Sequence, residues 1–239
     1  MSWAKRVPLP SRGLARKGVR MRFSFVCFLT VALCSVSATA GQGVFSGLPL
    51  SFEPNLGQAN PSAQFVARGA GYAISLQRNG IEMRVRGKDR DSLSTIRFSG
   101  GSSNAPQTSG RLPGDVNYFV GSDRKKWHAG VPTFATVTYP KVYPGIDVVY
   151  YGTQGQLEFD FRVHPGGAAS NIRLSFTGAT PRMDANGDLL VGDLRQHKPV
   201  AYQLSADNQR TDVAARYQVQ GPAIATSGCS TWFVAPNSA

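Results

Sequence analysis

Apolar and polar residues alternate with a period of two over much of the chain after residue 60. The clearest case is QLEFDFRV at 156–163, in which every second residue from Leu157 to Val163 is apolar and the residues between them are charged. A strand with one buried face and one wet face produces this period. Apolar residues at the 3.6-residue period of an amphipathic helix are absent. The pattern therefore predicts strands that each bury one face.

Short β-prone segments separated by turn residues lie on both sides of this strand. Asn79-Gly80 and Asn186-Gly187 are typical of two-residue hairpin turns. The polar, low-complexity stretch 99–110 predicts a flexible surface loop. The other predicted strands are 64–67, 72–76, 81–86, 93–98, 116–120, 134–139, 146–151, 172–176, 189–191, 199–204, 213–219 and 232–234. Many short strands with regular turns predict an all-β fold, a β-sandwich or a related two-sheet antiparallel architecture.

The first 40 residues have the order of a secretory signal peptide. A basic stretch ends at Arg22, an apolar run follows over 23–36, and Ala38-x-Ala40 gives the small-x-small pattern of a cleavage site. The apolar run is short for a membrane span, and no later segment replaces it. We expect cleavage before Gly41 and a secreted, periplasmic or cell-surface protein with no membrane span. Met21 is an alternative start.

The remainder divides into a lead-in over 41–61, a β-sandwich-like domain over 62–221 and a low-complexity tail over 222–239, which we interpret as a truncated end or the end of a stand-alone variant. Two of the three cysteines fall in the predicted signal, which leaves Cys229. No internal disulfide can then form, so the core must hold the domain together.

The net charge of +12 is concentrated at the N-terminus. Residues 1–40 hold seven of the 26 basic residues and no acidic one, so the rest of the chain carries 19 basic against 14 acidic residues. Its densest basic runs, 84–90 and 124–126, are typical of solvated turns. The charge therefore does not indicate a nucleic-acid partner.

Several segments spread in order along the chain form one distinctive set: FEPNLGQ (52–58), QFVARGAGYAISL (64–76), LPGDVNYFVG (112–121), YPKVYPGIDVVYYG (139–152), QLEFDFRVHPG (156–166), and the later DANGDLLV and HKPVAYQ. Together they resemble a bacterial family, the N-terminal exported domain found ahead of SBBP-type β-propeller repeats. The resemblance implies a cell-surface or secreted setting, with downstream propeller repeats as neighbours, and no catalytic residues to transfer.

Paired carboxylates are the first candidate for chemistry. Glu158 and Asp160 lie two apart on one strand, so both point to the same face and could serve glycoside hydrolysis. Position 163, where a third acid of a related motif would fall, is Val163, and Arg162 can neutralise Asp160. A wet strand face with a local ion pair explains the same residues.

No other motif predicts a catalytic, cofactor or metal site. Asp184-x-Asn186-Gly187-Asp188 resembles a calcium loop, but glycine stands at the fourth place and Arg195 at the twelfth, so a hairpin turn is favoured. The three histidines are scattered, without HExxH or GxSxG. Gly69-x-Gly71 lacks a third glycine. We therefore expect a protein that is not an enzyme and needs no cofactor.

Aromatic residues cluster at Tyr118, Phe119, Trp127, Tyr139, Tyr143, Tyr150 and Tyr151. They can fill a sandwich core or stack against sugar rings. Tyr150 and Tyr151 are adjacent, so their side chains face opposite sides. The candidate ligand surface comprises Trp127, Tyr143, Tyr150, Tyr151, Glu158 and Asp160.

The sequence favours a secreted or cell-surface, non-enzymatic β module with a structural, adhesion or scaffolding role. The alternative is a carbohydrate-binding or carbohydrate-acting β-sandwich. The partners expected are propeller repeats, other surface proteins or glycans.

Overall fold

The computed structural model describes residues 19–27, 50–69, 71–102, 104–153, 155–192, 194–205, 209–220 and 230–236. Side chains are described only between residues 50 and 218 of these ranges. The described chain forms two antiparallel sheets, with helix limited to two short 3₁₀ turns, η1 (Arg124–Lys126) and η2 (Ala169–Asn171). This confirms the predicted all-β class.

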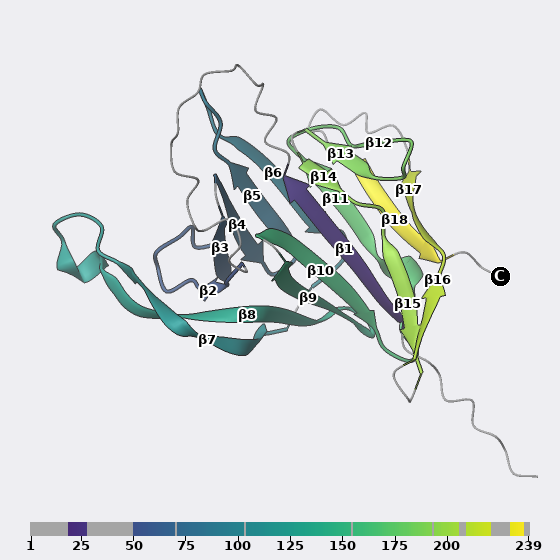
Figure 1. The fold of residues 1–239 in the computed structure, drawn as a ribbon, viewed down its shortest axis with the longest axis horizontal. Helices are drawn as coiled ribbons and strands as arrows, with labels where there is room; N and C mark the ends of the chain where they lie inside the picture. Colours follow the sequence, from purple (N-terminus) through teal and green to yellow (C-terminus); the bar gives the residue numbers. More distant parts are fainter. Residues whose placement is uncertain are drawn as a thin grey trace, which may run out of the picture.

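The first sheet holds the strand with the clearest alternation and the longest hairpin of the protein (Figure 1). Its path runs through β12 (Arg182–Met183), β13 (Leu189–Val191), β14 (Leu194–Gln196), β1 (Val19–Cys27), β10 (Gln156–Val163), β9 (Ile146–Thr153), β8 (His128–Tyr143) and β7 (Gln107–Tyr118). β15 (Val200–Leu204) also pairs with β1 and carries β16 (Arg210–Val213) on its other edge.

At one end of the second sheet, consecutive strands lie side by side as a meander. At the other end, strands from the C-terminal part of the chain complete the sheet. Its order is β17 (Ala215–Gln220), β18 (Ser230–Pro236), β11 (Arg173–Thr177), β6 (Ser92–Phe98), β5 (Gly80–Val85), β4 (Tyr72–Gln77), β3 (Phe65–Gly69) and β2 (Glu53–Pro54). The strands from β2 to β6 follow chain order. A two-residue turn joins β4 to β5, whereas residues 55–64 separate β2 from β3.

Large side chains from both sheets meet in one core. Phe98 on β6 packs against Phe159 and Phe161 on β10, with ring centroids 6.1 and 5.3 Å apart. All three rings are fully buried, as the alternation on β10 predicts. Burial of such apolar surface is the main stabilising contribution to a β-sandwich.

Two segments differ from the sequence prediction. β7 begins at Gln107, inside the stretch 99–110 predicted as a loop. It is an edge strand whose pairing partner among the described strands is β8, so its backbone is hydrogen-bonded on one side while most of its side chains stay exposed. Phe52, in the predicted lead-in, is buried and exchanges backbone hydrogen bonds of 2.9 Å with Phe134.

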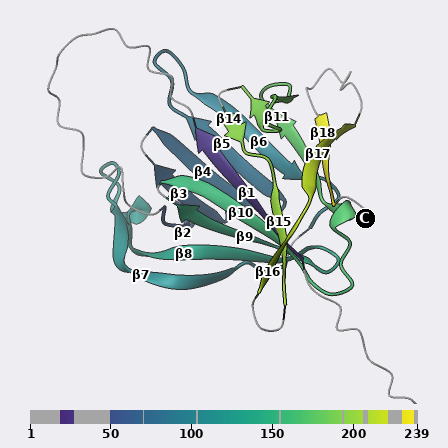
Figure 2. The ribbon, with the colours of Figure 1, turned by 45° about the vertical axis from the view of Figure 1, so that its right-hand side comes forward.

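The β7–β8 hairpin projects from the body of the protein as an arm (Figures 1 and 2). η1 lies at its tip. Most residues of β7 are exposed, and β8 is buried mainly toward its C-terminal half, where it joins the sheet. The distal part of the arm therefore contributes little to the core.

β1 and β18 fall inside the segments predicted as the leader and the tail. β1 is a backbone partner of β10, β14 and β15, and β18 lies between β17 and β11. The predicted cleavage site after Ala40 and the lone Cys229 lie outside the described residues. Over the ranges described, no helix has the length and apolar character needed to cross a membrane.

Candidate functional site

A shallow basic groove crosses the outer face of the second sheet. Two neighbouring cavities of about 230 and 190 Å³ share Arg68, Ala73 and Arg84, so together they form one groove. Arg68 on β3 pairs with Ala73 on β4, and Ala73 pairs with Arg84 on β5. Residues directly opposite each other in an antiparallel sheet share a face, so a methyl group lies between two long cationic side chains.

The alternation of β4 and β5 explains why these side chains face outward. Ile74 and Leu76 on β4, with Ile81 and Met83 on β5, are buried in the core. The residues between them must point the other way because side chains alternate along a strand. The groove is therefore the solvent face of the same strands that build the core.

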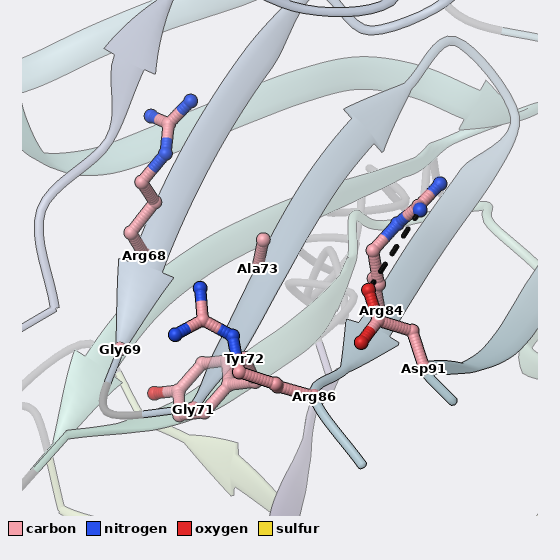
Figure 3. Close-up of a pocket in the computed structure, with 8 residues that line it drawn as sticks. All are labelled: Arg68, Gly69, Gly71, Tyr72, Ala73, Arg84, Arg86 and Asp91. Carbon is pink, nitrogen blue, oxygen red and sulfur yellow. Dashed lines mark ion pairs between the residues drawn. The ribbon is translucent and has the colours of Figure 1, made fainter. Parts of the chain in front are cut away.

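Three arginines, Arg68, Arg84 and Arg86, line the groove together with two carboxylates, Glu82 and Asp91. Arg84 lies 4.0 Å from Asp91, and Arg68 lies 3.4 Å from Glu53. Arg86 makes no ion pair with any described residue. Figure 3 shows Arg68 and Arg84 on either side of Ala73, with Arg86 close to Tyr72 at the Gly71 turn. The residues that line the groove therefore carry three positive charges against the two negative charges of Glu82 and Asp91, and Glu53, which does not line the groove, offsets Arg68.

This arrangement suits binding of an anionic group. A guanidinium donates paired hydrogen bonds to a carboxylate, sulfate or phosphate. The groove is open and its ion pairs are partly exposed, so we expect any such binding to weaken as salt is added.

A partly buried cluster joins the groove to the last residue of β7, near the tip of the arm. Tyr118 on β7 donates a hydrogen bond to Glu53 on β2, and Arg68 donates to both. The Arg68 guanidinium also lies 5.1 Å from the centroid of the Tyr118 ring. Burial, reinforced by the hydrogen bond and charge of Glu53, raises the pKa of Tyr118 well above its usual range, so the phenol stays protonated as a donor.

The tip of the arm exposes apolar and cationic groups together. Phe119 is 59% exposed and Val120 is 73% exposed. The ring of Trp127 meets Phe119 edge-on at 5.1 Å, and the Arg124 guanidinium lies 5.3 Å from the Trp127 ring. We call Phe119, Val120, Arg124, Lys125, Lys126 and Trp127 the arm tip. Exposed aromatic residues beside cations are typical of contact surfaces.

The six residues of the predicted ligand surface do not lie on one surface. Trp127 is at the arm tip, whereas Tyr143 and Tyr150 are 4% and 0% exposed and pack in the core. Tyr151 is half-buried and donates a hydrogen bond of 2.9 Å to Asp160. Glu158 and Asp160 are themselves buried, at 4% and 5% exposure, so the prediction of a wet face on β10 is wrong at these two positions. Of the two roles predicted for the aromatic residues, core packing and sugar stacking, Tyr143 and Tyr150 have the first.

Sequence reasoning missed the groove and interpreted 84–90 as a solvated turn. The alternation of Arg84 and Arg86 was visible, but the register that places Arg68 beside them was not. Phe119 was in the predicted aromatic cluster but not in the predicted ligand surface, and the exposure of Phe119 and Val120 was predictable because they precede a turn beside a run of cations.

The Asp184–Asp188 segment forms a turn between β12 and β13, as the hairpin interpretation predicts. The Asp184 carboxylate accepts from the backbone N–H groups of Asn186 and Asp188. Arg195 bridges both aspartates, at 3.0 and 3.2 Å. No group of three metal-ligating side chains occurs among the residues that are described.

The fold defines the chain as a two-sheet antiparallel β protein. A family model described as a domain of unknown function, DUF7948, matches residues 52–227, and the chain belongs to this family. No curated protein and no solved structure matches the chain. The family match covers both sheets from β2 to β17, the groove and the arm, whereas β1 and β18 lie outside it.

Proposed function

We propose that this chain is an exported, non-enzymatic module that attaches to other components of the cell surface, ahead of β-propeller repeats. The observation that carries the proposal is the arm, whose exposed tip contributes little to the core. A rigid sandwich that presents a projecting aromatic and basic hairpin is suited to contact a partner rather than to enclose a substrate.

The arm tip has the chemistry of a protein-contact surface. Trp127 and Phe119 supply apolar area that is held in place by their mutual packing. Trp127 Nε1 donates to the Gly121 carbonyl at 3.1 Å, which fixes the ring. Three successive cations, Arg124 to Lys126, add attraction to an acidic partner or surface.

The test is surface retention of the exported chain in a bacterial host. The double variant Phe119→Ser/Trp127→Ser should shift the protein from the cell-surface fraction into the medium, because the contact loses its apolar centre. Met183→Ser is the matched control, since Met183 is an exposed apolar residue on the small β12 strand. Equal retention of both variants would contradict the proposal, and so would a chain that stays in the cytosol with its leader intact.

A second candidate function is carbohydrate binding, favoured by the basic groove (Figure 3). Its size suits one or two sugar units, and its arginines suit glycans with carboxylate or sulfate groups. Glycoside hydrolysis by Glu158 and Asp160 is disfavoured, because both carboxylates are buried within β10.

A glycan array on the exported protein separates the two functions. If the groove binds acidic glycans, Arg84→Gln/Arg86→Gln should abolish the signal, whereas Phe119→Ser/Trp127→Ser should leave it unchanged. Arg182→Gln is the control, because Arg182 is an exposed arginine outside the groove. An array without signal, or a signal equally sensitive to all three changes, removes the groove as a glycan site.

A further inference from the structure

The first sheet depends on β1 for its continuity. β1 pairs along one edge with β10, from Val19↔Val163 to Ser24↔Glu158. Its other edge pairs with β15 and then with β14. In the part of the chain that is described, no other strand connects β10 to β14 or β15. Figures 1 and 2 both show the purple β1 strand between these neighbours.

We call the position that β1 occupies the strand slot. Its walls are β10 on one side and β14 with β15 on the other. An empty slot would leave backbone N–H and C=O groups without partners along both walls, a costly state for buried strands. It would also uncover the edge of the core at Phe159 and Phe161, which are fully buried while β1 is present.

The residues of β10 determine which types of residue a strand in the slot must carry at each position. Register pairs Met21 and Phe23 with Phe161 and Phe159, and it pairs Arg22 with Asp160. Directly opposite residues share a face of the sheet, so a matching strand needs apolar residues at every second position. Between them it needs a cation opposite Asp160, which is buried beside Glu158.

The slot belongs to the family domain, but the strand within it does not. β10, β14 and β15 lie within the matched residues 52–227, whereas β1 precedes them and falls in the predicted leader. Export with cleavage before Gly41 would take β1 away and leave the two walls behind.

We infer that the strand slot is a docking site that accepts a strand from a partner protein, with alternating apolar residues and a cation opposite Asp160. The inference rests on the proposed export, which vacates the slot. Addition of a strand to a sheet edge is a common mode of peptide recognition. A second copy offers no matching strand from its first-sheet edges, because β7 and β16 are mostly exposed and polar and β12 has two residues.

The test uses the full chain with a protease site inserted between Ala40 and Gly41. A labelled peptide of residues 19–27, VRMRFSFVC, serves as the probe, and fluorescence anisotropy measures its binding. After cleavage the peptide should bind saturably by exchange with the leader fragment. The uncleaved chain should bind it at least about tenfold more weakly, because a covalently tethered strand has a high effective concentration.

Two peptide variants make the test specific to register. Arg22→Glu places a carboxylate opposite Asp160 and should weaken binding about tenfold. Arg20→Glu is the matched control, because position 20 pairs with Arg162, and this peptide should bind at least as well as the natural one. Equal weakening of both peptides overturns the inference. Dimerisation of the cleaved chain that excludes the peptide also overturns it, in favour of a second copy.

A third variant covers the case in which the cleaved chain unfolds. Phe23→Pro in the uncleaved chain removes a backbone donor from β1 and should allow the peptide to bind without cleavage. If neither this chain nor the cleaved chain binds the peptide, the inference is wrong. N-terminal sequencing of the exported protein tests export separately, since an intact leader would overturn export while peptide binding would still show the slot.

Discussion

The hydroxyl group of Tyr143 on β8 forms hydrogen bonds with the backbone carbonyl and the backbone N–H of Arg173 on β11. It donates to the Arg173 carbonyl at 2.8 Å and accepts from the Arg173 N–H at 3.2 Å. β8 and β11 belong to different sheets, so one side chain bridges the two layers. Burial raises the pKa of Tyr143 to about 12, although the hydrogen bond and charge of Arg173 oppose the shift.

Tyr143→Phe should therefore destabilise the protein by about 1–3 kcal/mol, because the Arg173 N–H loses the Tyr143 acceptor, while the Arg173 carbonyl keeps the Ser99 N–H at 2.9 Å. Urea unfolding followed by tryptophan fluorescence measures the change. Tyr202→Phe is the control, since its ring stays in place near the Arg210 guanidinium, at 4.3 Å. A loss as small in Tyr143→Phe as in the control would show that the bridge carries no stability.

Gly80 is held to glycine by the close approach of β6. A Cβ at this position would lie 2.0 Å from the Ile96 carbonyl oxygen, a backbone atom that cannot rotate away. Gly80→Ala should cost about 1–3 kcal/mol through forced separation of the two strands. Gly114→Ala is the control, because a Cβ there meets nothing within 4 Å. Thermal unfolding should separate the two variants, and equal midpoints would refute the clash.

The period of two was sufficient to predict the strand class and the buried face of β10. It could not predict residues 107–115 of β7, because an edge strand needs only backbone pairing and can be polar on both faces, whereas the predicted strand 116–120 overlaps the end of β7. Adjacent tyrosines showed that one of Tyr150 and Tyr151 faces inward, but not which one. Pairing with the buried Phe159 places Tyr150 inside.

Predicting the groove would have required the register between strands, which the alternation of apolar and polar residues does not contain. Arg68 and Arg84 become neighbours only through the register of three strands around Ala73. A shift of one residue in either pairing would turn these side chains to the other face. The turn chemistry of Asn186-Gly187, by contrast, is local, and the hairpin there was predictable from the dipeptide.

Phe98 should be among the most sensitive positions of the core. It touches two rings of the opposite sheet, and its removal leaves a cavity between rigid layers. Phe98→Ala should cost about 3–5 kcal/mol. Leu93→Ala on the same strand is the control, because Leu93 is exposed, and it should change stability by less than about 0.5 kcal/mol. Chemical denaturation of both variants tests this contrast, which fails if Phe98→Ala unfolds at the denaturant concentration of the control.

Asp188 lies in the turn between β12 and β13, at the end of the first sheet away from β7, and its carboxyl group makes the free energy of unfolding depend on pH. Burial alone would raise its pKa, but the backbone N–H of Lys198 and the side chains of His197 and Arg195 bond the carboxylate and lower the pKa overall. A group whose pKa is lowered by folding stabilises the protein above its unfolded pKa, which is about 3.9 for aspartate. That contribution is lost as the pH falls through the lower folded value.

Asp188→Asn should therefore destabilise the protein at pH 7 by about 1–3 kcal/mol, because its partners lose a charged acceptor. The difference from the unmodified chain should shrink as the pH falls below about 4, because the carboxyl of the unfolded chain takes up a proton there and the folded carboxyl does so at lower pH. Asp212→Asn is the control, since the Asp212 carboxylate is mostly exposed beside Arg210 and should contribute little at any pH. Unfolding by urea at a series of pH values gives both curves. A difference for Asp188→Asn that stays constant from pH 7 to pH 3 would mean that the carboxylate is not stabilised by its three partners.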